Sequence, residues 1–585
     1  MNVPLTRYIE LLQKYMLPQR WLVAGLAVGL FANIALQLIN PQILRYFIDT
    51  AIDTSPDAPP LSALTYAAIA FLSVAIIVHL TSIATSYLGG SIAWNATNAL
   101  REDLASHCLR LDMSFHKSRT PGELIQRIDG DVGVLGNYFS TFLITIVGNV
   151  ILLAGSLAVL YLEELMVGLA LTVSSVVMLG IIYSMRGIAV KQNVAMFQSQ
   201  SDLYGFIEER LSGKEDVRAS GAIAYVIRRL YELVRNVYHR TLSSGYRSIL
   251  IQWTMITSFA LNHAIALALG AYLFLTDQIT LGTVFMIIQY IRLLQGPLMT
   301  ITGQVQALQQ FRASVERVEE LLGTVNAIVD GEGPDLPMGP LSVEFQNVGF
   351  SYGEGDNTLK NLSFALEPGK VLGLLGKTGS GKTTIARMLF RFYDPQSGQI
   401  CIAGHPITEC TVDNLRARIG MVTQDVQLFR ASVRDNLTFF DATVPDDDIL
   451  KAISQLGLTN WFESLPDGLN TKLGSSDLGL SAGEAQLLAF TRVFLSKPGV
   501  IILDEASSRL DPATEELMER AMDELLAERT AIVIAHRLET VKRADDIIIL
   551  DDGLIAEMGT RVNLERNEGS RFSRLLQMGF AEETT

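Results

Sequence analysis

Six apolar segments, each long enough to cross the hydrocarbon core of a lipid bilayer, occur in the first half of the sequence. They lie near residues 21–39, 62–86, 138–160, 164–185, 248–275 and 281–303. A chain that crosses a bilayer must satisfy its backbone N–H and C=O groups internally, so segments of this length predict membrane-spanning helices. The composition agrees, because 49% of the residues are apolar and only 18% are charged. The sequence therefore predicts a six-span helical membrane domain and excludes a disordered chain.

The distribution of Lys and Arg between the spans predicts the orientation of the helices. The three outward connections carry a single basic residue, Arg45, whereas residues 93–137 carry five and residues 186–247 carry ten. We therefore expect both long loops and both termini on the cytoplasmic side of the cell membrane. The helical patterning of the two loops predicts helices that extend out of the membrane and return. Residues 1–20 predict an amphipathic helix at the inner surface, and residues 21–320 complete the membrane domain.

The second half of the sequence has a different character. Residues 1–320 contain 22 basic and 22 acidic side chains, so the net charge of −15 lies within residues 321–585. Residues 321–340 are rich in Gly and Pro near their end and predict a linker, and residues 341–585 predict a soluble α/β domain. An acidic domain is a poor partner for a nucleic-acid backbone, so no nucleic acid is expected. The three cysteines have no spacing typical of a zinc site.

A glycine-rich sequence between an apolar strand and a helical pattern predicts nucleotide binding. It has the form G-x-x-x-x-G-K-T and comprises Gly376, Lys377, Thr378, Gly379, Ser380, Gly381, Lys382, Thr383 and Thr384. Its glycines let backbone N–H groups close around phosphates. We expect Lys382 to reach the β- and γ-phosphates of ATP and the Thr383 hydroxyl to ligate Mg²⁺.

Two further apolar strands end in residues that suit phosphate chemistry. Residues 500–503 are followed by Asp504 and Glu505, and residues 531–535 are followed by His536. A carboxylate at a strand end can hold the Mg²⁺ shell through water, which is the role expected of Asp504. Glu505 would polarise the attacking water, and His536 would sense or stabilise the γ-phosphate. Taken alone, Asp504 and Glu505 would more often mark an ordinary strand end, and His536 would more often be an ordinary surface histidine.

One basic residue lies well inside the last apolar segment. Arg292 has Gln289 and Gln295 at helical spacing on either side. An intramembrane Arg is energetically costly and faces a cavity or a partner group. Two interpretations stay open, a packing contact between helices and a position lining a substrate path.

In this order and spacing, the motifs of the second half resemble the nucleotide-binding domain of an ATP-binding cassette transporter. The residues that carry the resemblance, besides those above, are Tyr352, Gln424, Leu480 to Glu484, Ser507 to Asp511, and His536 to Leu538. The resemblance implies that adenine stacks on Tyr352 and that Gln424 contacts Mg²⁺. It also implies that Ser481, Ala482, Gly483 and Glu484 correspond to the LSGGQ signature, which faces ATP bound to the partner subunit. Glu505 and His536 would then be catalytic.

The resemblance extends to the membrane half. Residues 115–124, with Arg127 and Asp131, resemble the first intracellular loop of exporter-type members, and residues 211–217 resemble the second. The whole chain is therefore similar to a half-transporter. The implied fold is a six-span membrane domain of ABC exporter type fused to an α/β P-loop ATPase domain.

The signature departs from the family pattern. Ala482 replaces Gly, Glu484 replaces Gln, and Ala485 stands where Arg is usual, while Arg509 replaces Ala after the catalytic glutamate. The glycine-rich loop and the strand-end residues Asp504 and Glu505 follow the family pattern, whereas the signature is altered. This combination favours a heterodimer with one strong and one weak ATP site. A homodimer with a tolerated signature is the alternative.

The expected activity is ATP hydrolysis coupled to export of amphipathic or apolar compounds across the membrane. Closure of two ATPase domains would switch access from inside to outside. An importer of the same fold, for instance of a metal chelate, is the first alternative. A non-transport cassette ATPase is the second, and the six apolar segments argue against it.

Overall fold

The structure is a computed structural model of the whole chain. It describes residues 10, 13–52, 61–185, 190–353, 358–424, 426–473, 480–504, 512–535 and 541–578. The chain divides into two compact units. One is a helical unit (Met1–Leu109 with Pro121–Thr324), and the other is an α/β unit (Arg110–Thr120 with Val325–Thr585). The predicted amphipathic helix at residues 1–20 falls mostly outside the described residues.

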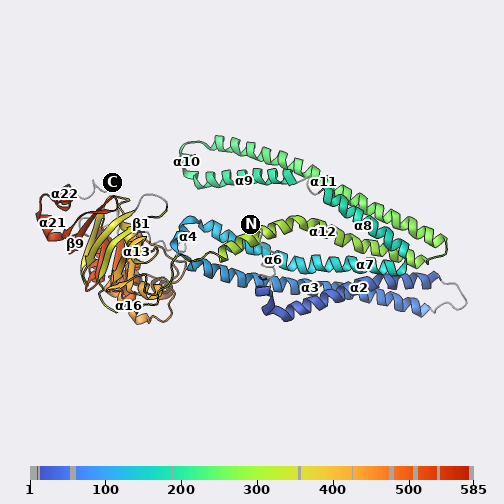
Figure 1. Cartoon of the computed structure of the whole chain (residues 1–585), viewed down its shortest axis with the longest axis horizontal. Coiled ribbons are helices and arrows are strands. Elements are labelled where there is room, and N and C mark those ends of the chain that lie inside the picture. Colours follow the sequence, from blue (N-terminus) through green and yellow to red (C-terminus); the bar gives the residue numbers. More distant parts are fainter. Residues whose placement is uncertain are drawn as a thin grey trace. The chain divides into compact units, whose positions relative to one another are not determined.

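The helical unit consists of long helices joined by short segments (Figure 1). Its elements are η1 (Leu17–Gln19), α2 (Arg20–Ile52), α3 (Leu61–Arg110), α5 (Pro121–Ile125), η2 (Gln126–Asp131), α6 (Val132–Thr141), η3 (Phe142–Val147), α7 (Gly148–Glu163), α8 (Leu165–Met185), α9 (Val190–Ser212), α10 (Lys214–Ala219), α11 (Ile223–Leu275) and α12 (Leu281–Leu322). The segments η2 and η3 are π-helical turns.

Six apolar helices overlap the six predicted segments, namely α2, α3, α7, α8, α11 and α12. The third predicted segment, 138–160, begins in α6 and continues through η3 into α7. Within the described residues, five have the length and composition to cross a membrane, and Leu165–Ile181 of α8 is a shorter apolar helix. Helices α3 and α11 run far beyond their apolar parts, and α9 lies antiparallel to the first part of α11 (Figure 1). The two long inward loops are therefore helical, as the sequence predicts.

Helices in the membrane half approach each other closely at small residues. A Cβ atom at Gly155 of α7 would lie 2.7 Å from Leu38 Cδ1 of α2, so a larger residue at this position would require the Leu38 side chain to move. Between α2 and α3, the Asn33 amide donates hydrogen bonds to Val78 O (2.8 Å) and Thr81 Oγ1 (2.7 Å). Close backbone packing and interhelical hydrogen bonds replace the hydrophobic driving force, which is weak between helices in lipid.

A group of charged residues joins three helices at their outward ends. Arg45, the one basic residue of the outward connections, pairs with Glu163 at the end of α7 and with Asp49 of α2. Asp49 also accepts hydrogen bonds from the Thr280 hydroxyl and the Gly282 N–H, both 2.8 Å long. Asp49 thereby caps the N-terminus of α12 and links it to α2.

A second group of ion pairs joins the first inward loop to the cytoplasmic end of α12. Asp131, 1% exposed at the end of the π-helical turn η2, accepts hydrogen bonds from Arg317 Nε (2.7 Å) and Ser314 Oγ (2.9 Å). Arg127 of the same turn binds Glu320 at 3.2 Å. These contacts give structural partners to the two residues that resemble the family loop motif.

The α/β unit contains two sheets and flanking helices. Its elements are α4 (Met113–Ser118), β1 (Val343–Phe350), β2 (Leu359–Leu366), β3 (Val371–Gly376), α13 (Lys382–Leu389), β4 (Ser397–Ile402), β5 (His405–Pro406), α14 (Val412–Arg418), β6 (Ile419–Val422), α15 (Val433–Thr438), α16 (Asp446–Gln455), α17 (Thr459–Glu463), η4 (Gly468–Asn470), α18 (Ala482–Ser496), β7 (Val500–Asp504), α19 (Pro512–Leu526), β8 (Thr530–Ile534), β9 (Asp546–Asp551), β10 (Leu554–Thr560), α21 (Arg561–Arg566) and α22 (Arg571–Met578).

The larger sheet has the strand order β10-β9-β3-β8-β7-β6 and is parallel except at β10. Strands β7 and β8 are buried along their whole length, which accounts for their continuous runs of apolar residues. The smaller sheet, β2-β1-β4-β5, is antiparallel. In a parallel sheet, ligands bind beyond the carboxyl ends of the strands, and the predicted site residues follow β3, β6, β7 and β8.

The ion pair between Asp131 and Arg317 yields a stability prediction. Arg317→Ala leaves a buried carboxylate without its cation, whereas Asp131→Asn leaves an arginine whose side chain is 45% exposed and reaches water. We expect Arg317→Ala to destabilise the chain by about 3 kcal/mol, and Asp131→Asn by about 1 kcal/mol. The apparent midpoint of thermal unfolding, measured in detergent, shows which of the two variants is less stable.

The matched control is Glu516→Gln, which breaks the exposed pair between Glu516 and Arg520 on α19. Its midpoint should stay close to that of the unmodified chain, because exposed pairs contribute about 0–1 kcal/mol. Equal midpoints for Arg317→Ala and Glu516→Gln would show that the buried pair does not hold α12 to the loop.

Candidate nucleotide-binding site

The glycine-rich loop connects the central strand β3 to helix α13. Gly376 has φ +143° and Gly381 has φ +106°, in the region that side chains with a Cβ rarely adopt. A Cβ at Gly376 would also lie 2.3 Å from Leu550 O of the neighbouring strand β9. The two glycines are therefore required by backbone geometry, which folds the loop tightly over the end of the sheet.

Lys382 begins α13 and turns back into the loop. Its side chain is buried, and its ammonium donates hydrogen bonds to Gly376 O and, at 3.0 Å, to Lys377 O. Burial lowers the pKa of Lys382, while the charge of Asp504 opposes that shift. The Ser380 hydroxyl is also buried and makes no hydrogen bond within the described part of the chain. A buried cation and an unused hydroxyl in one glycine-rich loop suit an anionic ligand.

The structure brings Asp504 to the same loop. Asp504, the last residue of β7, lies with its Oδ2 atom 3.4 Å from Thr383 Oγ1. On the adjacent strand β6, Val422 pairs with Leu503, so Gln424 follows at the same carboxyl edge and is exposed. A hydroxyl, a carboxylate and an amide oxygen are hard donors of the kind that Mg²⁺ prefers.

Tyr352 lies near the loop with its ring enclosed by other groups. Its hydroxyl donates to Thr384 Oγ1 (3.2 Å) and accepts from Arg387 Nη1 (3.3 Å). The ring makes an edge contact with Tyr393, and the Lys117 ammonium of α4 lies 3.9 Å from the ring centroid. A cation over an aromatic face is attracted by the ring quadrupole. Helix α4 comes from the first inward loop, so this loop reaches the predicted adenine platform.

The altered signature opens helix α18. Ser481 is its N-cap, and its hydroxyl accepts a hydrogen bond from Glu484 N (3.2 Å), while the Glu484 carboxylate accepts from Ser481 N (2.8 Å). This reciprocal pair is a capping box. Gly483 is buried, and the side chain of Ala482 is not described. The residue that departs from the family pattern thus places a carboxylate at the helix N-terminus.

Several predicted site residues fall outside the described residues, including Glu505, His536 and the segment 507–511. Among the described residues, the sequence analysis did not predict two basic side chains that contact Tyr352. They are Lys117 and Arg387. Arg387 lies one turn after Thr384 on α13, which was a usable signal. No sequence signal places Lys117 there, because the two residues are far apart in the chain. The spacing of Ser481 and Glu484 is itself a capping-box pattern and had predictive value.

Two family models match the chain. The model described as the ABC transporter transmembrane region matches residues 23–298. The model described as ABC transporter matches residues 359–508. The second match includes the glycine-rich loop, the signature and the end of β7.

Known proteins and one solved structure agree with the family models. A fatty acid ABC transporter ATP-binding/permease protein of Mycobacterium tuberculosis is 33% identical over 80% of this chain and 74% of its own length. A probable multidrug resistance ABC transporter ATP-binding/permease protein of Bacillus subtilis is 31% identical over 81% of this chain and 71% of its own length. The structure of a bacterial Atm1-family ABC exporter with ATP bound superposes with a TM-score of 0.80, at 26% identity, covering 96% of this chain and 98% of that one. The chain belongs to the ABC transporter family, as a multi-pass membrane protein whose cytoplasmic ATPase domain couples ATP hydrolysis to export.

Proposed function

We propose that ATP binds in the glycine-rich loop with its phosphates on Lys382 and its adenine beside Tyr352, and that Glu505 activates water for hydrolysis. The observation that carries the proposal is the buried Lys382 ammonium inside a loop shaped by glycines. A positioned general base contributes about 10²–10⁴-fold to such a reaction. His536 would stabilise the developing charge on the γ-phosphate, as the family resemblance implies.

The donor set also fits Mg²⁺. Thr383 Oγ1 and Asp504 Oδ2 are 3.4 Å apart, and Gln424 follows the adjacent strand. We assign Thr383 and Gln424 as direct ligands and Asp504 as a ligand through water. When bound, the ion neutralises charge on the transferred phosphoryl group. The chain itself supplies the fixed positions of the three oxygen donors at one edge of the sheet.

The capping box at Glu484 supports two unequal ATP sites. In the family, the N-terminus of this helix faces a phosphate bound to the partner, and a helix N-terminus carries roughly +0.5 charge. Here a full negative charge lies at that end, bonded to Ser481 N. It offsets the helix dipole and repels phosphate. We infer that this chain pairs with a second half-transporter and that the partner supplies the signature of the hydrolytic site.

The exported compounds are amphipathic or apolar. The membrane helices present large apolar side chains, among them Leu72 and Val173, each 60% exposed. The relatives above are described as transporters of fatty acids and as multidrug resistance proteins. A helical membrane domain with apolar surfaces suits compounds that partition into lipid.

The first test concerns ATP affinity. Lys382→Ala removes the buried cation of the loop, and the loss of one charged hydrogen bond is about 1.5–3 kcal/mol. We expect ATP affinity of the purified assembly to fall by about 10- to 100-fold. Equilibrium binding of a fluorescent ATP analogue measures the change. Lys360→Ala, which removes an ammonium bound to exposed Asp552, is the control and should leave affinity unchanged. Unchanged affinity in Lys382→Ala would contradict the assignment.

The second test separates binding from hydrolysis. Glu505→Gln keeps the size of the side chain and removes the base, so turnover should fall by about 10²–10⁴-fold. ATP should still bind with its original affinity. A phosphate-release assay and a binding assay on the same preparation distinguish the two effects. Hydrolysis at the original rate would assign the base to another residue.

The third test concerns the two sites. Glu484→Gln keeps the capping box, because Gln at this position also caps, and removes the charge. In a heterodimer, Ala482→Gly with Glu484→Gln should change total ATPase by less than about twofold, because the partner's own residues limit that site. In a homodimer both sites would change, and turnover would rise strongly. Expression of the chain alone and with a second half-transporter supplies the comparison, and a fully active homodimer would overturn the pairing.

A further inference from the structure

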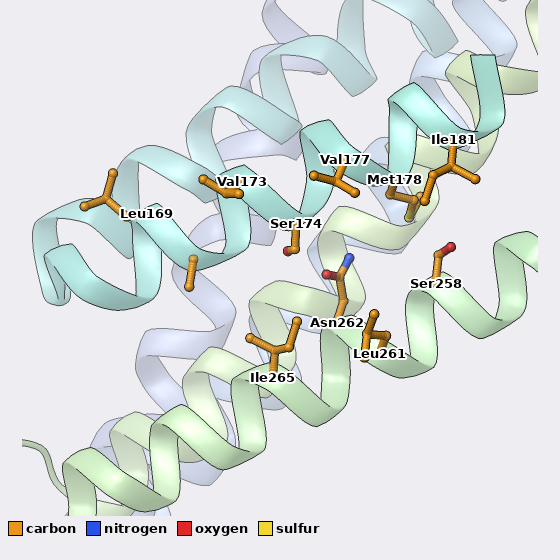
Figure 2. Close-up of a pocket in the computed structure, with 11 residues that line it drawn as sticks. Leu169, Val173, Ser174, Val177, Met178, Ile181, Ser258, Leu261, Asn262 and Ile265 are labelled. Carbon is orange, nitrogen blue, oxygen red and sulfur yellow. The ribbon is translucent and has the colours of Figure 1, made fainter. Parts of the chain in front are cut away.

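An open groove with a volume of about 570 Å³, called the cavity below, lies between the apolar parts of α8 and α11 (Figure 2). This volume falls in the range of small-molecule sites, about 300–1,000 Å³. One wall is formed by Leu169, Val173, Val177 and Ile181, which recur every fourth residue along one face of α8. Twelve residues of helix separate the first from the last, about 18 Å at 1.5 Å per residue. The wall is therefore a long apolar trough.

One polar side chain points into this cavity without a partner. Asn262 of α11 is 6% exposed and lies at the middle of the apolar segment 248–275. Figure 2 shows its amide directed toward α8. It makes no hydrogen bond to another described residue, whereas the other two polar residues of the lining bond to their own helices. Ser174 donates to Leu171 O at 3.1 Å, and Ser258 donates to Thr254 O at 2.8 Å.

Another buried asparagine in the membrane half has hydrogen-bond partners for its amide. Asn33, 7% exposed, satisfies its amide with Val78 O and Thr81 Oγ1. An unsatisfied amide in an apolar environment is unfavourable, and polar residues retained in membrane spans mark functional positions. The Asn262 amide is therefore available to form hydrogen bonds with a molecule that enters the cavity.

The lining also defines the charge of the occupant. Among the described residues that line the cavity, none is Lys, Arg, His, Asp or Glu. A carboxylate or ammonium placed there would be desolvated without a counter-charge, which is strongly unfavourable. An uncharged hydroxyl, or an amide that carries an N–H, can both accept from and donate to the Asn262 amide, and an ester carbonyl can accept from its NH₂ group. The apolar trough leads away from this point along α8.

We propose that this cavity binds a single-chain amphipathic molecule with an uncharged polar group, of the monoacylglycerol or fatty amide type. The chain lies along the apolar face of α8 and the polar group bonds to Asn262. The proposal rests on the export function above and names a substrate class and a site for it. The helix of a partner subunit is the competing occupant, because polar residues also join helices in membranes.

Photolabelling tests the site directly. A diazirine-tagged monoacylglycerol is added to the full chain in lipid vesicles without nucleotide, and cross-linked peptides are mapped by mass spectrometry. Val177→Trp fills the cavity and should strongly reduce labelling of the α8 and α11 peptides. Val176→Trp is the matched control, because the neighbouring Val176 is 62% exposed and does not line the cavity. Asn262→Leu should weaken labelling by about tenfold, the effect of one lost hydrogen bond.

Three results would overturn the proposal. The first is equal labelling in Val177→Trp and Val176→Trp. The second is labelling by the diazirine-tagged free fatty acid, as its carboxylate, that matches or exceeds labelling by the ester. The third is loss of subunit association in Asn262→Leu with labelling unchanged, which would assign the amide to a partner helix.

A second measurement applies if a tryptophan variant does not assemble. Because Cys108, Cys401 and Cys410 are buried, Val177→Cys and Val176→Cys introduce accessible thiols. The monoacylglycerol should protect residue 177, and not residue 176, from a membrane-permeant maleimide. Equal protection contradicts the site. Labelling needs no ATP and should persist in Lys382→Ala, so a failure of ATP-driven export is distinguishable from a failure of this site.

Discussion

Backbone hydrogen bonding in an apolar solvent is the constraint on which this protein depends. The bilayer offers no water to unpaired N–H and C=O groups, so the first half of the chain forms helices wherever it is apolar. Lipid also removes the hydrophobic drive for helices to associate. The helical unit is held instead by close glycine contacts, by the Asn33 amide, and by ion pairs at both ends of the helices. These polar contacts connect α12 to its neighbours at its outward end and to the first inward loop at its cytoplasmic end.

The ATPase unit follows from a different constraint, the geometry of a parallel sheet. Strands β3, β6, β7 and β8 are parallel, so their carboxyl ends meet at one edge. The glycine-rich loop, Gln424 and Asp504 come from separate parts of the sequence and reach that edge because of the strand order. Helix α4 belongs to the same compact unit and brings Lys117 to Tyr352. The segment Arg110–Thr120, which comes from the first half of the sequence, is thereby part of the α/β unit and lies beside the proposed adenine platform.

The membrane spans and the position of the nucleotide site were predictable from the sequence, because the patterns that indicate them are local. Apolar length predicts the spans, and the strand ends and glycines predict the nucleotide site. The contacts between distant residues were not predictable, since neither the pairing of Asp131 with Arg317 nor the position of Lys117 has a local pattern. Arg292 shows a further limit of local patterns. It is exposed on α12 and forms no ion pair with a described residue, so the packing interpretation gains no support within this chain. The position of the Asn262 amide in the cavity was likewise not predictable, because the cavity is formed by two helices that are far apart in the sequence.

The direction of transport is the most direct test of the account. Inside-out vesicles that carry the assembled transporter expose the ATPase domain to added ATP, and a fluorescent amphipathic dye reports transport. The account predicts that ATP drives the dye into the vesicle lumen and that ADP does not. ATP-driven loss of dye from preloaded vesicles, without accumulation in empty ones, would contradict export and favour uptake by the same fold.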